Sequence, residues 1–201
     1  MRSKLFFACV LALLLSGMAA SASAQAVYAA HESQTRFAIG AGFSGFEADL
    51  GPHFLLGPAV WGDYNPPFIS GILRGVGVEG EARGILLNRG GLADGTYETT
   101  VGGGLIYHPR FLRVHAASPY VKVIASMGWN PVYAGYGPPF LVSSFGGGVD
   151  YHLSHHLAIR GEYEYQQWYG VPSAAHPNHQ STASPNGFTA GVMYGFGGRR
   201  R

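Results

Sequence analysis

Apolar and polar residues alternate with a period of two in eight separate stretches of this 201-residue chain. The clearest stretch is 156–168, where Leu157, Ile159 and Tyr163 fall on one face and Arg160 and Glu162 fall on the other. No period of 3.6 residues fits it, and strict alternation is typical of a β-strand with two chemically different faces. The pattern therefore predicts an all-β protein.

The eight predicted strands are about 10 to 13 residues long, as judged from the alternation. Their apolar faces fall within residues 37–43, 54–64, 76–82, 97–107, 121–129, 141–153, 157–165 and 188–196. The sixth and seventh stretches are separated by little more than Ser154 and His155, which predicts a tight hairpin. Pro58 lies inside the second stretch, and a strand tolerates proline only at an edge or a bulge.

The connections between these strands alternate in length. Residues 65–70, 109–117 and 153–155 are short or marked by proline, whereas 88–95, 130–139 and 169–186 are longer and rich in Gly, Pro or polar residues. The first connection, 47–52, is also short. One end of the predicted sheet therefore carries most of the loop length.

Composition supports strands and excludes several protein classes. The 31 glycines are about 15% of the chain, twice the usual ~7%, and the charged fraction of 12% is half the usual ~25%. Low charge excludes a disordered acidic or basic tail, and the absence of a Gly-X-Y repeat excludes collagen. The composition suits strands that meet a nonaqueous surface.

The first 24 residues are typical of a cleaved signal peptide. Arg2 and Lys4 precede an apolar run over 5–15, which is shorter than the ~20 residues of a spanning helix, and 22–24 form a small-residue cleavage site. Its removal leaves 11 basic and 11 acidic residues and takes away the single cysteine, Cys9. Without a basic field, nucleic acid is not an expected partner. We expect residues 25–198 to form the barrel domain and 199–201 a basic tail.

Aromatic residues distinguish a membrane barrel from a soluble one. The apolar faces of the four strands that run toward the short turns end in tyrosine: Tyr64, Tyr107, Tyr151 and Tyr194. Outward tyrosines at one level are typical of an interfacial girdle. Trp129, Phe43, Tyr165 and Tyr97 are the candidates for a second girdle at the other end. These features predict an eight-stranded antiparallel transmembrane up-and-down β-barrel.

The polar faces then enclose a charge network, because an eight-stranded barrel is only wide enough for side chains. Its predicted members are Glu79, Glu81, Arg83, Glu98, Lys122, Asp150, Arg160, Glu162 and Glu164. Buried charges must be paired, and six acids face three fixed cations here. We expect His152, tyrosine hydroxyls and water to contribute.

The hairpin 146–168, GGGVDYHL followed by HLAIRGEYEYQQW, resembles the penultimate hairpin of the outer membrane protein beta-barrel family. Residues 119–128 and 187–196 resemble the strands before and after it. The resemblance implies a small barrel of the OmpA/OmpX type in the outer membrane of a Gram-negative bacterium. Family members usually end in an aromatic residue used in assembly, whereas Phe196 is followed by Gly197, Gly198 and 199–201.

Catalytic, cofactor and metal signatures are weak. His155-His156 and His176-x-x-His179 are candidate metal ligands without carboxylate or cysteine neighbours. Glycine triplets at 102–104 and 146–148 lie within strands and precede no helix, so they are not phosphate loops. Glu162 and Glu164 resemble a carboxylate pair, but Arg160 favours an ion network. We expect no catalytic, cofactor-binding or metal-binding residue.

Three functions remain open from the sequence. The first is a non-enzymatic outer-membrane protein, not a general porin, that acts through its rim loops, chiefly 169–186. Its expected partners are outer-membrane lipids, lipopolysaccharide and the assembly machinery, and it is expected to be a monomer. The second is a membrane-embedded enzyme that modifies lipid or lipopolysaccharide. The third is a soluble secreted or periplasmic barrel that binds an apolar ligand on inward Leu, Val and Tyr faces.

Overall fold

The computed structural model describes residues 36–47, 54–69, 71–85, 87–88, 91–92, 98–130, 139–172 and 180–196. The chain divides into two compact units, Met1–Glu32 and Ser33–Arg201, and all described residues belong to the second. The predicted signal peptide 1–24 and basic tail 199–201 lie outside the described residues. Within the described part, no helix has the length and apolar character to cross a membrane.

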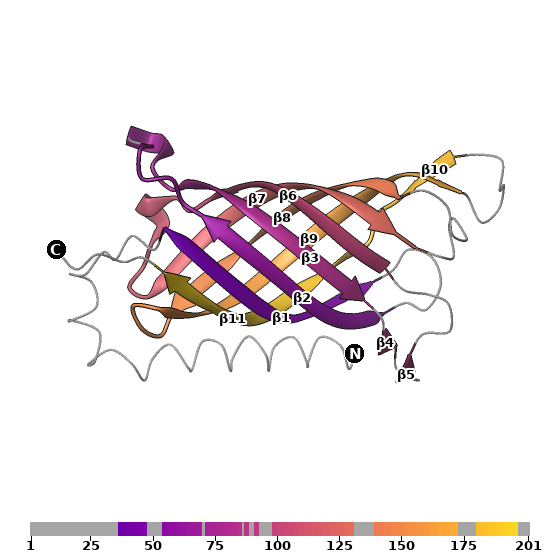
Figure 1. Ribbon diagram of the computed structural model, residues 1–201, viewed down its shortest axis with the longest axis horizontal. Coiled ribbons are helices and arrows are strands. Elements are labelled where there is room, and N and C mark those ends of the chain that lie inside the picture. Colours follow the sequence, from indigo (N-terminus) through magenta and orange to yellow (C-terminus); the bar gives the residue numbers. More distant parts are fainter. Residues whose placement is uncertain are drawn as a thin grey trace, which may run out of the picture. The chain divides into compact units, whose positions relative to one another are not determined.

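Eight antiparallel strands close into a barrel (Figure 1). They are β1 (Phe37–Glu47), β2 (Leu55–Tyr64), β3 (Val76–Ile85), β6 (Glu98–Tyr107), β7 (Ala117–Trp129), β8 (Phe140–His152), β9 (Leu157–Pro172) and β11 (Asn186–Phe196). Each pairs with its neighbours along the chain, and β1 pairs with both β2 and β11. The last pairing leaves no open edge, which confirms the predicted fold class.

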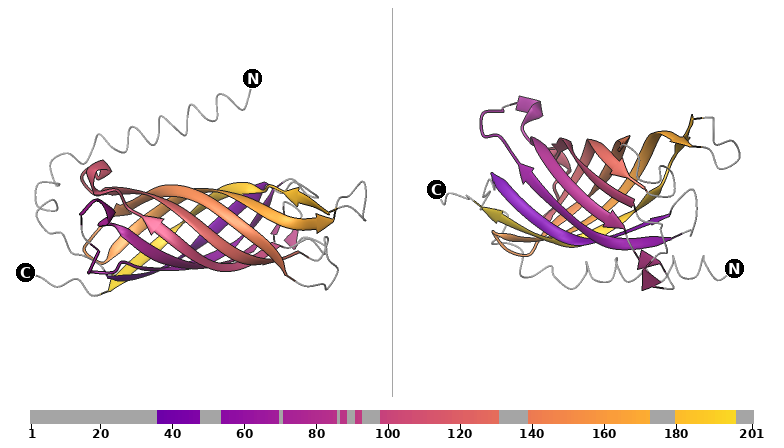
Figure 2. Two further views of the ribbon diagram at one scale, coloured as in Figure 1. Left: turned by 90° about the horizontal axis from the view of Figure 1, so that it is seen from above. Right: turned by 45° about the vertical axis from the view of Figure 1, so that its right-hand side comes forward.

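Three short strands lie at the end of the barrel opposite the β2–β3 and β6–β7 turns (Figures 1 and 2). They are β4 (Leu87–Asn88), β5 (Gly91–Leu92) and β10 (Gln180–Ala183). The turns carry two short 3-10 helices, η2 (Gly71–Leu73) and η3 (Arg110–Leu112). We call these two ends of the barrel the loop end and the turn end.

The structure corrects the predicted loop 169–186. Strand β9 continues to Pro172 and β10 pairs with it, so part of that segment extends the β9 hairpin beyond the barrel. The sequence does not predict this extension, because Gly170 and Pro172 interrupt the alternation of apolar and polar residues. Gly170 has a left-handed backbone conformation, with a φ of 76°. Packing stabilises the extension, since Trp168, Val171, Ala183 and Val142 form a buried cluster.

Pro58 lies where the ladder between β2 and β3 changes register. Ala59 pairs with Arg83, but Leu56 pairs with Leu87 of β4, so the two pairings differ by one residue. On the other side, the pairing with β1 continues through Pro58, which lies opposite Phe43. The irregularity satisfies the rule that a proline inside a sheet sits at a bulge.

Exposure separates the two faces of every barrel strand in the predicted sense. The outward side chains are apolar and exposed; they include Ile39, Val60, Val101, Val123, Phe145, Ile159 and Val192. Val121, Val149 and Leu157, which would line the ligand cavity of a soluble barrel, also point outward. The apolar surface therefore faces lipid, and the alternative of an inward apolar face is wrong.

Glycines on the inward face make room for two tryptophans. A Cβ on Gly40 would lie 2.2 Å from Trp61 Cε2, and one on Gly128 would lie 2.6 Å from Trp168 Cη2. Both tryptophans are buried in the barrel. In a barrel this narrow, a large inward side chain therefore requires a residue without a Cβ on a facing strand.

Candidate functional site

Arg160, the fourth residue of β9, connects three acids from three other strands. Its Nε donates to Asp150 Oδ1 at 2.8 Å, its Nη1 to Glu79 Oε2 at 2.6 Å and its Nη2 to Asp63 Oδ2 at 2.7 Å. The guanidinium also lies over the ring of Tyr120, 4.5 Å from its centroid. The planar fork of arginine suits such multiple contacts, so Arg160 cross-links β2, β3, β8 and β9 through the interior.

Lys122, in the middle of β7, is the second centre of the interior. Its Nζ lies 2.5 to 3.0 Å from carboxylate oxygens of four residues: Glu79, Glu81, Glu162 and Glu164. The ammonium has only three protons to donate, so the four carboxylates share them. Through Glu79 the cluster around Lys122 is continuous with the one around Arg160.

Arg83 of β3 completes the network toward the loop end. It donates to Glu164 with two nitrogens, Nη1 at 2.7 Å and Nη2 at 3.3 Å, and its Nε donates to Ser44 Oγ at 3.0 Å. Glu81 and Glu162 lie within 3.7 Å of the same guanidinium. All of these charged side chains are buried, and fixed pairs are the condition under which burial of charge is tolerated.

These ion pairs join eight of the nine predicted interior residues and one that the sequence analysis missed, Asp63. The alternation of β2 contained the signal for Asp63, because it lies on the face opposite Val60 and Tyr64. Glu98, the ninth residue, is buried nearer the loop end, where Asn130 Nδ2 donates to its Oε1 at 3.4 Å.

Neutral side chains add donors to the surplus of acids. Tyr120 donates its hydroxyl to Glu162 Oε2 at 2.6 Å, and Gln166 Nε2 donates to Glu164 Oε1 at 2.8 Å. The imidazole that bonds to Asp150 belongs to His108, with Nε2 3.1 Å from Oδ2, whereas the sequence analysis favoured His152. Spacing along one strand could not identify His108, which lies at the β6–β7 turn.

Three of the interior carboxylates could in principle hold a metal ion. Oxygens of Glu81, Glu162 and Glu164 lie within 4.8 Å of one another. However, Lys122 Nζ contacts all three, and Arg83 contacts them as well. The fixed cations stand where a metal ion would bind, so this trio is part of the ion network.

The interior leaves little free volume around these charges. A cavity of about 10 Å³ lies among Trp61, Glu79, Glu81, Lys122 and Arg160. That is at the lower limit for a single water molecule. The side chains therefore fill the barrel at this level, as the strand number predicts.

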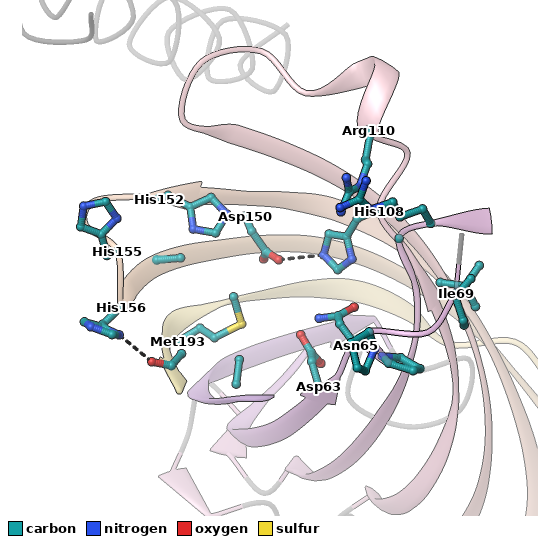
Figure 3. Close-up of a pocket in the computed structure, with 18 of the residues that line it drawn as sticks. Asp63, Asn65, Ile69, His108, Arg110, Asp150, His152, His155, His156 and Met193 are labelled. Atoms are coloured by element: carbon teal, nitrogen blue, oxygen red, sulfur yellow. Dashed lines mark hydrogen bonds and ion pairs between the residues drawn. The ribbon is translucent and has the colours of Figure 1, made fainter. Parts of the chain in front are cut away.

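A larger pocket of about 130 Å³ opens at the turn end (Figure 3). Asp63 and Asp150 line it, and both carboxylates are held by Arg160. Four imidazoles also line it: His108, His152, His155 and His156. The pocket is open to the turn end, and the side chains of the ion network separate it from the loop end.

Of the two histidine pairs that the sequence offers as candidate metal ligands, the structure describes only His155 and His156. His156 donates from Nδ1 to the carbonyl of Gly195 at 2.9 Å and stacks on Tyr194, so its ring is held against the end of β11. His155 lies beside it at the pocket (Figure 3). His176 and His179 lie outside the described residues.

The predicted girdle tyrosines lie at or near the turn end of their strands. Tyr64, Tyr107 and Tyr151 occupy the last two positions of β2, β6 and β8, and Tyr194 lies two residues before the end of β11. Tyr107 is half-buried, and the other three are exposed.

For the second girdle, Trp129 ends β7 and is exposed, as are Phe43 and Tyr165. Phe43 lies in the middle part of β1, opposite Pro58 and Ala190, rather than at its loop end. Tyr97 lies outside the described residues.

A closed antiparallel barrel with an apolar exterior and a paired, charged interior defines a transmembrane β-barrel protein. The model of the outer membrane protein beta-barrel domain matches residues 10–196. The chain belongs to this family and is an outer-membrane protein.

Several solved structures are similar to this chain. Neisserial surface protein A is 16% identical, with a TM-score of 0.56 over 80% of this chain and 97% of that one. Ail, the attachment invasion locus protein of Yersinia pestis, is 16% identical, with a TM-score of 0.45 over 80% and 96%. OprG from Pseudomonas aeruginosa is 12% identical, with a TM-score of 0.44 over 80% and 95%. No curated protein matches the chain. The likeness to the neisserial protein supports the barrel fold.

Proposed function

We propose that this barrel is a non-enzymatic surface protein of the outer membrane, which acts through its loop end and is not a general porin. The observation that carries the proposal is the filled interior, in which Lys122, Arg83 and Arg160 bridge strands on opposite sides of the barrel. A barrel filled in this way has no lumen, so its outer surfaces remain for function.

The loop end supports the proposal because it is built as a protrusion. The β9 hairpin continues past the barrel and has its own buried cluster around Trp168 and Val171. Outer-membrane barrels place their longer connections outside the cell and their short turns in the periplasm. The hairpin is therefore positioned to meet surface components such as lipopolysaccharide.

The interior carboxylates are poor candidates for catalysis. Glu162 and Glu164 are buried and are bonded to Lys122, Tyr120 and Arg83. A general acid or base must reach its substrate, and these groups face only other side chains. The proposal therefore includes no lipid-modifying activity.

Export and assembly belong to the same proposal. Residues 1–24 serve as the cleaved signal peptide, 25–198 form the barrel domain and 199–201 a basic tail. The outer-membrane assembly machinery inserts the chain as a monomer, since the closed sheet leaves no edge for a second copy.

Epitope insertion in intact cells tests the orientation. A tag inserted after His176 should be bound by antibody on intact cells, whereas a tag after Ser154 should be bound only after the outer membrane is permeabilised. Surface labelling of the tag at Ser154, or failure to label the tag at His176 in a folded protein, would contradict the proposal.

Lipid analysis tests the absence of activity. Mass spectrometry of phospholipid and lipopolysaccharide incubated with the purified protein should match that of samples without protein. A new lipid species that disappears with a variant of Glu162 or Glu164 would establish the enzymatic alternative.

A further inference from the structure

The turn end differs sharply from the loop end in charge. The β2–β3 and β6–β7 turns contain Arg74, Arg110 and Arg113 and no acidic residue. Arg36 lies just before β1, at the same end of the barrel. The segments between strands at the loop end contain Asp49, Asp94 and a single arginine, Arg89. Fixed positive charge is therefore collected on one side of the membrane.

The same two turns expose large apolar side chains to solvent. Phe68 of the β2–β3 turn is 80% exposed and Phe111 of the β6–β7 turn is 77% exposed. Leu73, Leu112 and Val114 are exposed as well. Each 3-10 helix ends in leucine followed by arginine, Leu73-Arg74 in one turn and Leu112-Arg113 in the other. The chain therefore repeats the same amphipathic arrangement in two neighbouring turns.

Backbone hydrogen bonds define the shape of part of each turn. In the β6–β7 turn, Val114 and Ala117 exchange two bonds at 3.1 and 2.9 Å around His115, whose φ is 54°. In the β2–β3 turn, Arg74 N–H donates to Gly71 O at 3.1 Å. Leu73 and Val114 thus lie on hydrogen-bonded parts of their turns.

The two turns are also hydrogen-bonded to each other where they leave β3 and β6. His108 N–H donates to Gly75 O at 2.9 Å, and a Cβ on Gly75 would lie 2.3 Å from His108 O. Tyr64 and Tyr107, two of the predicted girdle residues, directly precede the turns. The apolar groups therefore begin where the outer surface of the barrel reaches the membrane–water interface.

We propose that the β2–β3 and β6–β7 turns form a lipid-binding platform on the leaflet at the turn end of the barrel. Phe68, Leu73 and Phe111 enter the boundary of the acyl region, and Arg74, Arg110 and Arg113 bind phosphate groups of anionic phospholipids. Apolar groups interleaved with arginine suit this surface, because a bilayer offers hydrocarbon and negative charge at adjacent depths. A polar glycan would leave the phenylalanines uncovered.

Site-directed spin labelling measures the depth of the turns directly. The full chain with Cys9→Ser has no other cysteine, so Phe68→Cys and Phe111→Cys each carry a single label. Ser154→Cys, in the β8–β9 turn at the same end, is the matched control. Each protein is reconstituted in phosphatidylcholine bilayers with or without phosphatidylglycerol, and the accessibility of the label to oxygen and to a water-soluble nickel chelate is compared.

We expect the ratio of oxygen to nickel accessibility to be higher at positions 68 and 111 than at 154, and to rise further with phosphatidylglycerol. Combining Arg74→Gln, Arg110→Gln and Arg113→Gln should remove the response to phosphatidylglycerol. Because both leaflets have the same composition in this experiment, the result does not depend on the orientation of the barrel in the cell.

Three outcomes would overturn the proposal. One is equal nickel accessibility at 68, 111 and 154 in both bilayers. Another is a response to phosphatidylglycerol that survives the arginine substitutions. The third is protection of positions 68 and 111 only after a soluble periplasmic extract is added, which would assign the platform to a protein partner. Two labelled turns keep the test valid if one variant does not fold.

Discussion

A few single side chains make most of the ion pairs inside this barrel, because each buried cation pairs with several acids at once. Arg160 holds Asp63, Glu79 and Asp150, which come from three different strands. Removing one partner from such a group leaves charge buried without compensation, and this costs more than the pair itself contributes. The individual cations should therefore be sensitive positions.

Arg160→Met should lower the free energy of unfolding in lipid by about 3–5 kcal/mol, because three carboxylates lose their common partner. Urea titration of the reconstituted barrel, followed by tryptophan fluorescence, measures the change. Arg36→Met replaces an exposed arginine and should change the value by less than about 0.5 kcal/mol. Equal stability of both variants would mean that the interior ion pairs contribute nothing.

Gly40 offers a second test at this scale, because its missing Cβ makes room for Trp61. Gly40→Ala places a methyl group 2.2 Å from the indole, so the tryptophan must shift at a cost of about 1–3 kcal/mol. Gly161→Ala, at an outward position with no atom within 4 Å of the new Cβ, is the control and should cost little. The same urea titration compares the two variants, and an unchanged Gly40→Ala protein would contradict the packing argument.

At the scale of the strands, the period of two was sufficient to predict the number and closure of the barrel strands. It also assigned Lys122 and Glu162 to the interior, because every residue of a strand takes one of two faces. It could not predict which charged side chains form ion pairs. Strands β3, β7 and β9 are not neighbours in the sheet, so their contacts depend on the curvature and closure of the barrel. Asp63 and His108 were missed for related reasons, the first in a weakly patterned strand and the second in a turn.

The outward face of β7 supports a prediction about insertion into lipid. Val123 is the seventh of 13 residues in β7, and Val149 is the tenth of 13 in β8, nearer the turn end. Val123→Arg should destabilise the barrel in lipid by about 2–4 kcal/mol, and Val149→Arg by less, because the cost of arginine falls toward the interface.

Folding yield into phospholipid vesicles and urea titration measure both effects. Leu153→Arg, in the β8–β9 turn, is the matched control and should fold with unchanged stability. If Val123→Arg folds as readily as Leu153→Arg, the exposed valines do not face lipid.

At the scale of the whole molecule, the interior is layered along the barrel axis. Ala38, Ala158 and Met193 form a small apolar cluster toward the turn end, and Phe46, Leu55 and Ile85 form another toward the loop end. The charged residues lie between them, and only Asp63 and Asp150 among the paired acids also line the pocket at the turn end. This layering explains how a narrow barrel holds a surplus of acids, since each acid is enclosed with a cation or a donor.

A filled interior predicts the transport properties of the whole barrel. Ions would have to pass Lys122 and Arg160 where a cavity of about 10 Å³ remains, and no hydrated ion fits that space. Purified protein in a planar bilayer should therefore show no stable conductance of porin size, while a larger porin measured in the same membrane provides the positive control. Stable porin-sized steps would contradict both the strand count and the monomer, because only a wider barrel or a pore between copies could carry that current.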